Sequence, residues 1–252
     1  MSGRNALVTG GARRIGRTIA LTLAAHGWDV AVHYGGSRDD AEALVAEIKQ
    51  HERRAVALTA DLTREAEVAG LVPRAIEAIG PLTLLVNNAS AFERDDAMTV
   101  TRASWDRHIE TNLRAPFVLM QEFARQLPAE ADGSVVNILD ERVWNLTPYF
   151  VSYTVSKAGL WTLTQTMALA LAPRIRVNGI GPGPTLPSPR QSDEQFRRQV
   201  DVLPLRRGTT PDEIAHAVMF ILKSPAMTGQ MIALDGGQHL NWAPISRLPP
   251  SE

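Results

Sequence analysis

The stretch Ala6-Leu-Val-Thr-Gly-Gly-Ala-Arg-Arg-Ile-Gly16 joins a short apolar segment to a glycine-rich turn, and it decides the fold. Gly10 and Gly11 permit a tight turn and close approach of the backbone to a ligand, and Gly16 permits a helix to begin beside the strand. The first turn of such a helix presents unpaired N–H groups and a positive potential, which favour a pyrophosphate. We therefore predict a strand–turn–helix unit that binds a dinucleotide.

Apolar segments typical of strands alternate with helical patterns along the rest of the chain. This alternation is typical of a mostly parallel sheet with right-handed crossovers and covered faces. We predict an α/β fold with one domain over residues 1–252, a Rossmann-type doubly wound parallel sheet of about seven strands with helices on both faces. The expected strands are 6–8, 30–32, 55–58, 82–87, 134–139, 175–180 and 231–234. The expected helices are 17–26, 39–51, 65–79, 153–172, 211–222 and 104–126, the last kinked or divided at Pro116.

Two segments fall outside this alternation. Residues 182–200 begin with a proline-rich run, and we expect them to form a loop over the site, with a rigid surface loop as the alternative. Residues 241–252 are rich in proline and serine and are expected to form a tail or an edge arm. Ligands of open parallel sheets bind at the carboxyl ends of the strands, so the site is expected there.

Composition excludes several classes of protein. The 252 residues carry a formal net charge of −1, which gives no electrostatic reason to expect nucleic acid or an anionic membrane as partner. No apolar run approaches the roughly 20 residues that a membrane span needs, and no signal-peptide core follows the start. The chain has no cysteine, and its six histidines show no ligand spacing, so we expect no metal site. A cytoplasmic protein with a small-molecule ligand is expected.

The end of the second strand indicates which dinucleotide binds. An NAD-specific fold places an acidic residue there to hold the ribose hydroxyls. This chain instead reads His33-Tyr-Gly-Gly-Ser-Arg38, with no acid before Asp39. We predict that Ser37 and Arg38 bind a 2′-phosphate and that the cofactor is NADPH; a solvated Arg38 is the alternative.

Tyr153 and Lys157 stand one helical turn apart, so that a phenol and an ammonium lie on one helix face. The ammonium favours the phenolate, and we therefore expect a lowered pKa for Tyr153 and a role as proton donor. Thirteen residues earlier lies Asp140. A carboxylate at this position opposes a developing oxyanion and suits a substrate with a polarised C=N bond and N–H donors.

Together these motifs resemble the short-chain dehydrogenase/reductase family over about residues 4–240. The resemblance implies that Asn112 supports the lysine through a water, that Lys157 binds the nicotinamide ribose, and that Asp61 binds the adenine. It gives Asp140, Tyr153, Lys157 and Asn112 as catalytic residues. It also implies a homotetramer formed through the helices at 104–126 and 153–172. The expected cofactor-binding residues are Gly10, Arg13, Arg14, Ile15, Gly16, Ser37, Arg38, Asp61, Leu62, Asn88, Ala89, Ser90, Tyr153, Lys157, Pro182 and Gly183.

Three departures from the common family pattern are similar to the pteridine reductase branch. Arg14 replaces the middle glycine of the turn, Asp140 replaces the usual serine, and Asn87-Asn-Ala-Ser-Ala-Phe92 carries a serine where the family has glycine. The resemblance implies that Phe92 stacks on a pterin and that Ser90 hydrogen-bonds it. The expected substrate-binding residues are Arg14, Ser90, Phe92, Asp140 and Tyr153.

The prediction is therefore an NADPH-dependent reductase that acts on the ring C=N bond of a pterin. A ketone or alcohol oxidoreductase of the same family is the alternative, with Asp140 protonated or displaced. A non-catalytic dinucleotide-binding protein is a further alternative, against which the retention of Asn112, Tyr153 and Lys157 argues. Other readings of single residues are core packing for Phe92, a salt bridge with Arg142 for Asp140, and exposure to solvent for Arg14.

Overall fold

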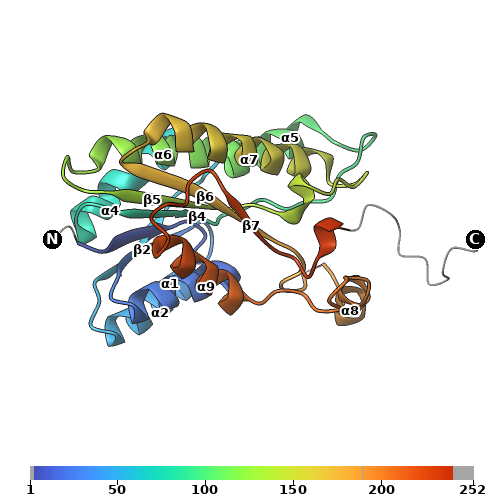
Figure 1. Cartoon of the computed structure of the whole chain (residues 1–252), viewed down its shortest axis with the longest axis horizontal. Helices are drawn as coiled ribbons and strands as arrows, with labels where there is room; N and C mark the ends of the chain where they lie inside the picture. The colour runs from blue at the N-terminus through green and yellow to red at the C-terminus, as the bar shows by residue number, and fades with distance from the viewer. Residues whose placement is uncertain (1–2, 189, 241–252) are drawn as a thin grey trace, which may run out of the picture.

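Seven parallel strands form one twisted sheet in the computed structural model, which describes residues 3–188 and 190–240 (Figure 1). The order across the sheet is β3-β2-β1-β4-β5-β6-β7, so that β1 and β4 meet where the winding reverses. This confirms the predicted doubly wound α/β fold. The strands are β1 (Asn5–Val8), β2 (Asp29–Tyr34), β3 (Ala55–Thr59), β4 (Leu84–Asn87), β5 (Gly133–Ile138), β6 (Ile175–Pro182) and β7 (Met231–Leu234).

Helices cover both faces of the sheet (Figure 1). One face carries α1 (Arg14–Ala25), α2 (Arg38–Gln50) and α9 (Pro211–Leu222), and the other carries α4 (Leu71–Ile79), α6 (Ala115–Gln126) and α7 (Val151–Leu171). In the described ranges, no helix combines the length and the apolar character that a membrane crossing requires. The remaining helical segments are α3 (Glu65–Ala69), α5 (Arg102–Ile109), α8 (Asp193–Asp201), the π-helical turn Glu110–Arg114, and the 3₁₀ turns Glu141–Val143 and Gln238–Leu240.

The central strands are buried on both faces, and alternate residues of each strand enter two different cores. In β1, Ala6 and Val8 pack among α1, α2 and α9, whereas Leu7 packs among α4, α6 and α7. In β4, Val86 packs in the first of these cores and Leu85 in the second. Because the side chains of a strand alternate between faces, this continuous apolar pattern places the strands inside the molecule and their carboxyl ends at one shared edge.

Two of the predicted helices are interrupted. The helix expected at 65–79 is divided at Gly70, three residues before Pro73, which has no N–H to donate to the carbonyl oxygen of Ala69. The helix expected at 104–126 contains the π-helical turn Glu110–Arg114, which ends just before Pro116 in the first turn of α6. Proline has no N–H to donate to the preceding turn, so the local widening agrees with the expected division at this residue.

The segment 182–200 is only partly a loop. Pro182 ends β6, and residues 193–201 form α8. Ser192 accepts from the backbone N–H of Gln195, and the Gln195 side chain accepts from that of Ser192, which is a capping box. The prediction of a loop over the whole range is therefore wrong for its second half. The expected tail at 241–252 lies outside the described residues.

His33 in β2 is buried beneath the glycine-rich turn. Its Nδ1 accepts from the backbone N–H of Gly10 at 3.1 Å, and its Nε2 lies 3.1 Å from the carbonyl oxygen of Ala60, to which it donates. Both contacts require the neutral ring with its hydrogen on Nε2. Burial lowers the pKa of His33.

This burial makes stability depend on pH. An unfolded histidine takes up a proton below about pH 6.5, whereas the folded His33 does so only at lower pH. The contribution of His33 is therefore complete above about pH 6.5 and is lost as the pH falls towards the folded pKa. His33→Asn keeps an acceptor near Gly10 but does not titrate. Urea unfolding between pH 5 and 7.5 should show a shallower decline in the free energy of unfolding for this variant than for the wild type; equal slopes would contradict the assignment.

Candidate active site

A cleft of about 750 Å³ lies at the carboxyl ends of the strands near the β1–β4 junction. Its walls come from the glycine-rich turn, from the ends of β2 and β3, and from the segment after β4. This position is the one predicted for the ligand of a doubly wound sheet. The lining residues are Gly10, Arg13, Arg14, Ile15, Gly16, His33, Gly35, Gly36, Thr59, Ala60, Asp61, Leu62, Thr63, Glu67, Asn88, Ala89, Ser90, Ala91, Arg107 and Thr111.

The turn has no space for side chains where it meets the segment after β4. A Cβ atom on Gly16 would lie 2.2 Å from the carbonyl oxygen of Gly10, and Gly10 itself has φ = 59°. Asn88 fixes the turn by donating from Nδ2 to the carbonyl oxygens of Thr9 and Gly10 at 2.9 and 3.0 Å. No side chain caps the N-terminus of α1, so its first N–H groups remain available to an anionic ligand.

Arg14 has φ = 53°, in the left-handed region that favours glycine. This explains why a glycine at this turn position suits the common family pattern. The guanidinium crosses to the segment after β6 and donates to the carbonyl oxygens of Pro187 and Leu186 at 3.0 and 3.2 Å. Arg14 therefore connects the glycine-rich turn to the loop at 183–188 and does not simply extend into solvent.

The two residues predicted for a 2′-phosphate lie away from the cleft wall. Ser37 and Arg38 are not among its lining residues, and Arg38 is an exposed side chain that donates to Glu42 at 2.7 Å, one turn further along α2. Arg13 lines the cleft and pairs with Asp40 at 2.5 Å. Arg13 is therefore a cation that lines the cleft near the end of β2, whereas Arg38 is exposed and paired with Glu42.

Asp61 and Leu62 follow β3, and both line the cleft as predicted for the nucleotide end. The Asp61 carboxylate accepts from the Oγ1 and the backbone N–H of Thr63 at 2.7 and 2.9 Å, and these bonds lower its pKa. The group is therefore a fixed, ionised acceptor at neutral pH. At the opposite end, Pro182 and Gly183 close β6, and a Cβ atom on Gly183 would lie 2.8 Å from the Cα of Asp235.

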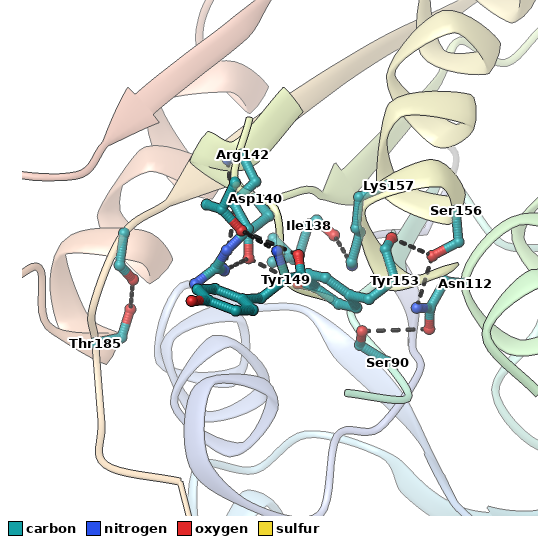
Figure 2. A network of polar contacts seen from close by, with 12 residues as sticks. Ser90, Asn112, Ile138, Asp140, Arg142, Tyr149, Tyr153, Ser156, Lys157 and Thr185 are labelled. Atoms are coloured by element: carbon teal, nitrogen blue, oxygen red, sulfur yellow. Dashed lines mark hydrogen bonds and ion pairs between the residues drawn. The ribbon is translucent and has the colours of Figure 1, made fainter. Parts of the chain in front are cut away.

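Asp140 and Tyr153 point towards one another from the end of β5 and the first turn of α7 (Figure 2). The phenol donates to Oδ2 of Asp140 at 2.7 Å. Arg142 donates from one nitrogen to both oxygens of the same carboxylate, at 3.1 and 3.0 Å. The side chains of Asp140 and Arg142 are only 13% and 14% exposed, so this ion pair is shielded from water. The residues therefore form a buried relay of guanidinium, carboxylate and phenol.

The expected lowering of the Tyr153 pKa is wrong for this arrangement. Burial and the negative charge of Asp140 raise the pKa of Tyr153 well above its ordinary value. Lys157 donates instead to the carbonyl oxygen of Ile138 at 2.8 Å, and its Nζ lies 5.8 Å from the centre of the tyrosine ring (Figure 2). Burial lowers the pKa of Lys157 to about 8. The phenol therefore holds its proton at neutral pH.

Asn112 lies in the π-helical turn and joins the segment after β4 to α7. Its Oδ1 accepts from the backbone N–H of Ala91 at 2.8 Å and from the hydroxyl of Ser90 at 3.2 Å. Its Nδ2 donates to the carbonyl oxygen of Ala91 and to the Ser156 hydroxyl at 2.9 and 3.0 Å. Asn112 thus acts on the backbone around the site, and none of its hydrogen bonds reaches Lys157.

Phe92 is 39% exposed, but its ring is not free on both sides. It stacks on Phe150 at 4.8 Å with an interplanar angle of 10°, and the ring of Tyr153 meets it edge-on at 4.7 Å. The guanidinium of Arg142 lies over both phenylalanine rings, 5.7 Å from Phe92 and 5.4 Å from Phe150. Phe92 therefore belongs to an aromatic wall beside Asp140 and Tyr153, and the contact with Phe150 was not predicted.

Three residues of the site were missed in the sequence. Arg142 was predicted only as a salt-bridge partner of Asp140, and its contact with the rings of Phe92 and Phe150 was not predicted. Its position two residues after Asp140 was the available signal. Phe150 has φ = 60° and precedes α7, and no local pattern indicates its stacking on a residue 58 positions earlier. His33 sits within an apolar strand, where an isolated polar residue is a signal of a buried hydrogen-bonding role.

Comparison with known proteins decides the family. A model of the short chain dehydrogenase family matches residues 4–198, which is more than half of the chain. The chain belongs to the short-chain dehydrogenase family. Within this family, the 3-oxoacyl-[acyl-carrier-protein] reductase FabG of Staphylococcus epidermidis is 35% identical over 242 residues, covering 94% of this chain and 99% of that relative.

Two solved structures of this family are more similar in sequence. FolM alternative dihydrofolate reductase 1 from Brucella suis, in complex with NADP, is 51% identical, with a TM-score of 0.92, and the match covers 95% of this chain and 96% of that one. The Brucella canis protein of the same name, also with NADP, is 50% identical, with a TM-score of 0.90 and coverage of 94% and 95%. The predicted family is confirmed, and the similarity to two proteins named as dihydrofolate reductases agrees with the predicted resemblance to the pteridine reductase branch.

The influence of Asp140 on the phenol is open to direct measurement. Asp140→Asn removes the negative charge that opposes the phenolate, so the pKa of Tyr153 should fall towards the ordinary value of about 10. The chain has only three tyrosines, which makes ultraviolet titration of the phenols practical. The variant should ionise its last tyrosine at lower pH than the wild type, with circular dichroism confirming the fold; an unchanged or raised midpoint would contradict the arrangement.

Proposed function

We propose that this protein is an NADPH-dependent reductase that acts on the ring C=N bond of a pterin. The observation that carries the proposal is the hydrogen bond from Tyr153 to the ion-paired carboxylate of Asp140. A site for carbonyl reduction needs a donor where the substrate oxygen becomes negative, and here that position holds an anionic acceptor. A heterocycle with N–H donors matches the acceptor.

The residues of the cleft fit a dinucleotide. The glycine turn leaves no space for Cβ atoms beside the uncapped N-terminus of α1, and Arg13 and Arg14 lie at the same end. Asp61 would accept hydrogen bonds from the adenine, and Lys157 would hold the nicotinamide ribose. When bound, NADPH supplies the hydride that adds to the ring carbon. The complexes of the two Brucella proteins with NADP support this choice of cofactor.

Tyr153 supplies the proton in this proposal. A phenol that keeps its proton at neutral pH is ready to donate it once a stronger acceptor arrives. A substrate amino group that donates to Asp140 would replace the phenol at the carboxylate and allow the O–H of Tyr153 to turn towards the ring nitrogen. Asp140 therefore anchors the ring, Tyr153 provides the proton, and solvent restores it after the reaction.

The aromatic wall offers a surface for a flat ring. Phe92 is partly exposed beside Tyr153, and Phe150 supports it from behind. Ser90 lies at the junction of this wall and the cleft, and its hydroxyl can hydrogen-bond a heteroatom of the ring. Arg14 reaches the loop at 186–187 across the opening. These residues provide stacking and hydrogen bonding together, as in other sites for small heterocycles.

Reduction of a ketone is the second candidate, because the Staphylococcus epidermidis relative is named as a 3-oxoacyl reductase. In that case Asp140 would have to be protonated or displaced when the substrate oxygen becomes negative. Replacement of Asp140 by serine would then retain or raise activity. The buried ion pair with Arg142 favours the pterin, because displacement of Asp140 would leave the buried guanidinium without its partner.

Assembly as a homotetramer through α6 and α7 is also proposed on the family pattern. Leu169 and Val155 of α7 are exposed, at 83% and 43%. Exposed apolar residues on a long helix are compatible with a contact between subunits.

The substrate is tested by NADPH oxidation with 7,8-dihydropterin, dihydrofolate and a series of simple ketones and 3-oxoacyl thioesters. We expect turnover of the dihydropterin, with Tyr153→Phe and Asp140→Ser each lowering kcat/KM by about 100-fold or more. Asp106→Asn removes an exposed carboxylate that pairs with Arg102 and lines neither the cleft nor the relay, and it serves as the control. Turnover of ketones alone, with Asp140→Ser as active as the wild type, would replace the pterin proposal with the ketone one.

Cofactor selection is tested with two arginine variants. Arg13 lines the cleft and Arg38 does not, so Arg13→Ala should raise the KM for NADPH by about tenfold, the usual effect of losing one charge-assisted hydrogen bond. Its KM for NADH should change little, and Arg38→Ala should resemble the wild type. The wild type should prefer NADPH in steady-state kinetics. Equal turnover with NADH would contradict the preference for NADPH. A larger effect of Arg38→Ala than of Arg13→Ala on the KM for NADPH would instead support Arg38 as the residue that binds the 2′-phosphate.

A further inference from the structure

A buried polar cluster lies next to the aromatic wall, outside the residues that the proposed reaction uses. It consists of Asp95 in the segment after β4, His108 in α5, and Ser152 in the first turn of α7. Their side chains are 3%, 0% and 0% exposed. Such a group of ionisable side chains inside a protein needs complete hydrogen bonding to be stable.

The carboxylate of Asp95 is the acceptor of the cluster. It accepts from the Ser104 hydroxyl at 2.8 Å, from the backbone N–H of Ser152 at 3.2 Å, and from the Ser152 hydroxyl by a short hydrogen bond. Burial opposes ionisation of Asp95, but the bonds from Ser152 and Ser104 together lower its pKa. The Ser152 hydroxyl therefore donates its one hydrogen to Asp95.

The hydrogen bond from Ser152 to Asp95 determines the tautomer of His108. Nδ1 of His108 lies 2.7 Å from the Ser152 hydroxyl, which has no second hydrogen to give, so the ring nitrogen must donate. On the other side of the ring, Nε2 lies 3.0 Å from the backbone nitrogen of Glu93, which donates to it. His108 is therefore neutral, with its hydrogen on Nδ1 and a bare Nε2.

Each contact of the cluster is adjacent to a residue of the site. Glu93 follows Phe92, and Ser152 precedes Tyr153. The backbone N–H of Phe150 donates to the carbonyl oxygen of Asp95 at 2.6 Å, and the ring of His108 lies edge-on to that of Tyr153 at 6.0 Å. The cluster therefore fixes the two backbone segments from which the aromatic wall and the phenol project.

We propose that His108 is a positioning residue, which as the Nδ1–H tautomer sets the spacing between the Phe92 segment and the first turn of α7. It acts by accepting from Glu93 and donating to Ser152 at the same time. The effect on substrate binding rests on the proposed function, whereas the tautomer does not.

Protonation of His108 would place a hydrogen on Nε2 against the N–H of Glu93 and would break this link. The charged groups that face His108 are Asp95 and Glu93 from the segment after β4 and Arg107 from α5, and Tyr153 faces it from α7. Burial dominates over these charges and lowers the pKa of His108, so the link holds at neutral pH. As the pH is lowered, the KM for the substrate should therefore rise at a higher pH than the Kd for NADPH does.

Two variants separate the two contacts. Gln at position 108 carries its terminal oxygen near the place of Nε2 and keeps an acceptor for Glu93. Asn carries its amide nitrogen near the place of Nδ1, which keeps the donor to Ser152 but leaves Glu93 without an acceptor. His216→Asn, on the exposed surface of α9, is the matched control.

With 7,8-dihydropterin, His108→Asn should raise the KM by about tenfold, the effect of leaving one buried N–H without a partner. The kcat and the Kd for NADPH should change less, and His108→Gln should stay closer to the wild type. If His108 had only a structural role, its replacement would lower the melting temperature without raising the KM for the dihydropterin more than the Kd for NADPH. Equal KM values for both variants and the wild type would overturn the proposal.

The tautomer is measured on the wild-type protein by the side-chain nitrogen shifts of labelled histidine, which distinguish Nδ1–H from Nε2–H. This measurement needs neither a variant that folds nor the correct substrate. A ring with its hydrogen on Nε2 would overturn the proposal whatever the enzyme reduces. Absence of dihydropterin turnover together with the Nδ1–H tautomer would instead refute the substrate assignment, and the variants would then be compared on the substrate that is reduced.

Discussion

A carboxylate inside a protein must be matched by a cation and by hydrogen-bond donors, and this requirement at Asp140 organises the site. Arg142 supplies the cation, and Tyr153 supplies an O–H. The neighbouring Glu141 is also buried, and burial together with the charge of Asp140 raises its pKa to about 8, so that it remains neutral at pH 7. The guanidinium that balances Asp140 also lies over Phe92 and Phe150, which joins the polar and aromatic parts of the site.

The parallel sheet and its glycine turn were predictable because they depend on local patterns, the apolar runs of the strands and the small residues at one turn. The meeting of Asp140 and Tyr153 followed from the resemblance to the family. The net shift of the Tyr153 pKa was predicted with the wrong sign, because burial and the charge of Asp140 raise it, and a helical spacing to Lys157 gives neither of these effects. The pairing of Arg38 with Glu42, one turn along the same helix, was not predicted, because the expectation for Arg38 considered only a ligand.

The site combines a shared scaffold with a few changed positions. Proteins named for 3-oxoacyl and dihydrofolate reduction match nearly the whole chain, so the fold alone does not distinguish their chemistry. Under the proposed function, the distinction lies at residue 140, where Asp140 stands in place of the hydroxyl donor expected from the family pattern. The π-helical turn that carries Asn112 is part of the scaffold, since it fixes the backbone at Ala91 and so the start of the aromatic wall.

The reach of Arg14 has a consequence for protein engineering. Its backbone occupies a conformation better suited to glycine, while its guanidinium holds two carbonyl oxygens of a loop more than 170 residues away. The turn and the loop are therefore not interchangeable modules. A chimera whose exchanged loop follows another backbone path would leave Arg14 strained and without its two carbonyl acceptors, so residue 14 and the loop should be transplanted together.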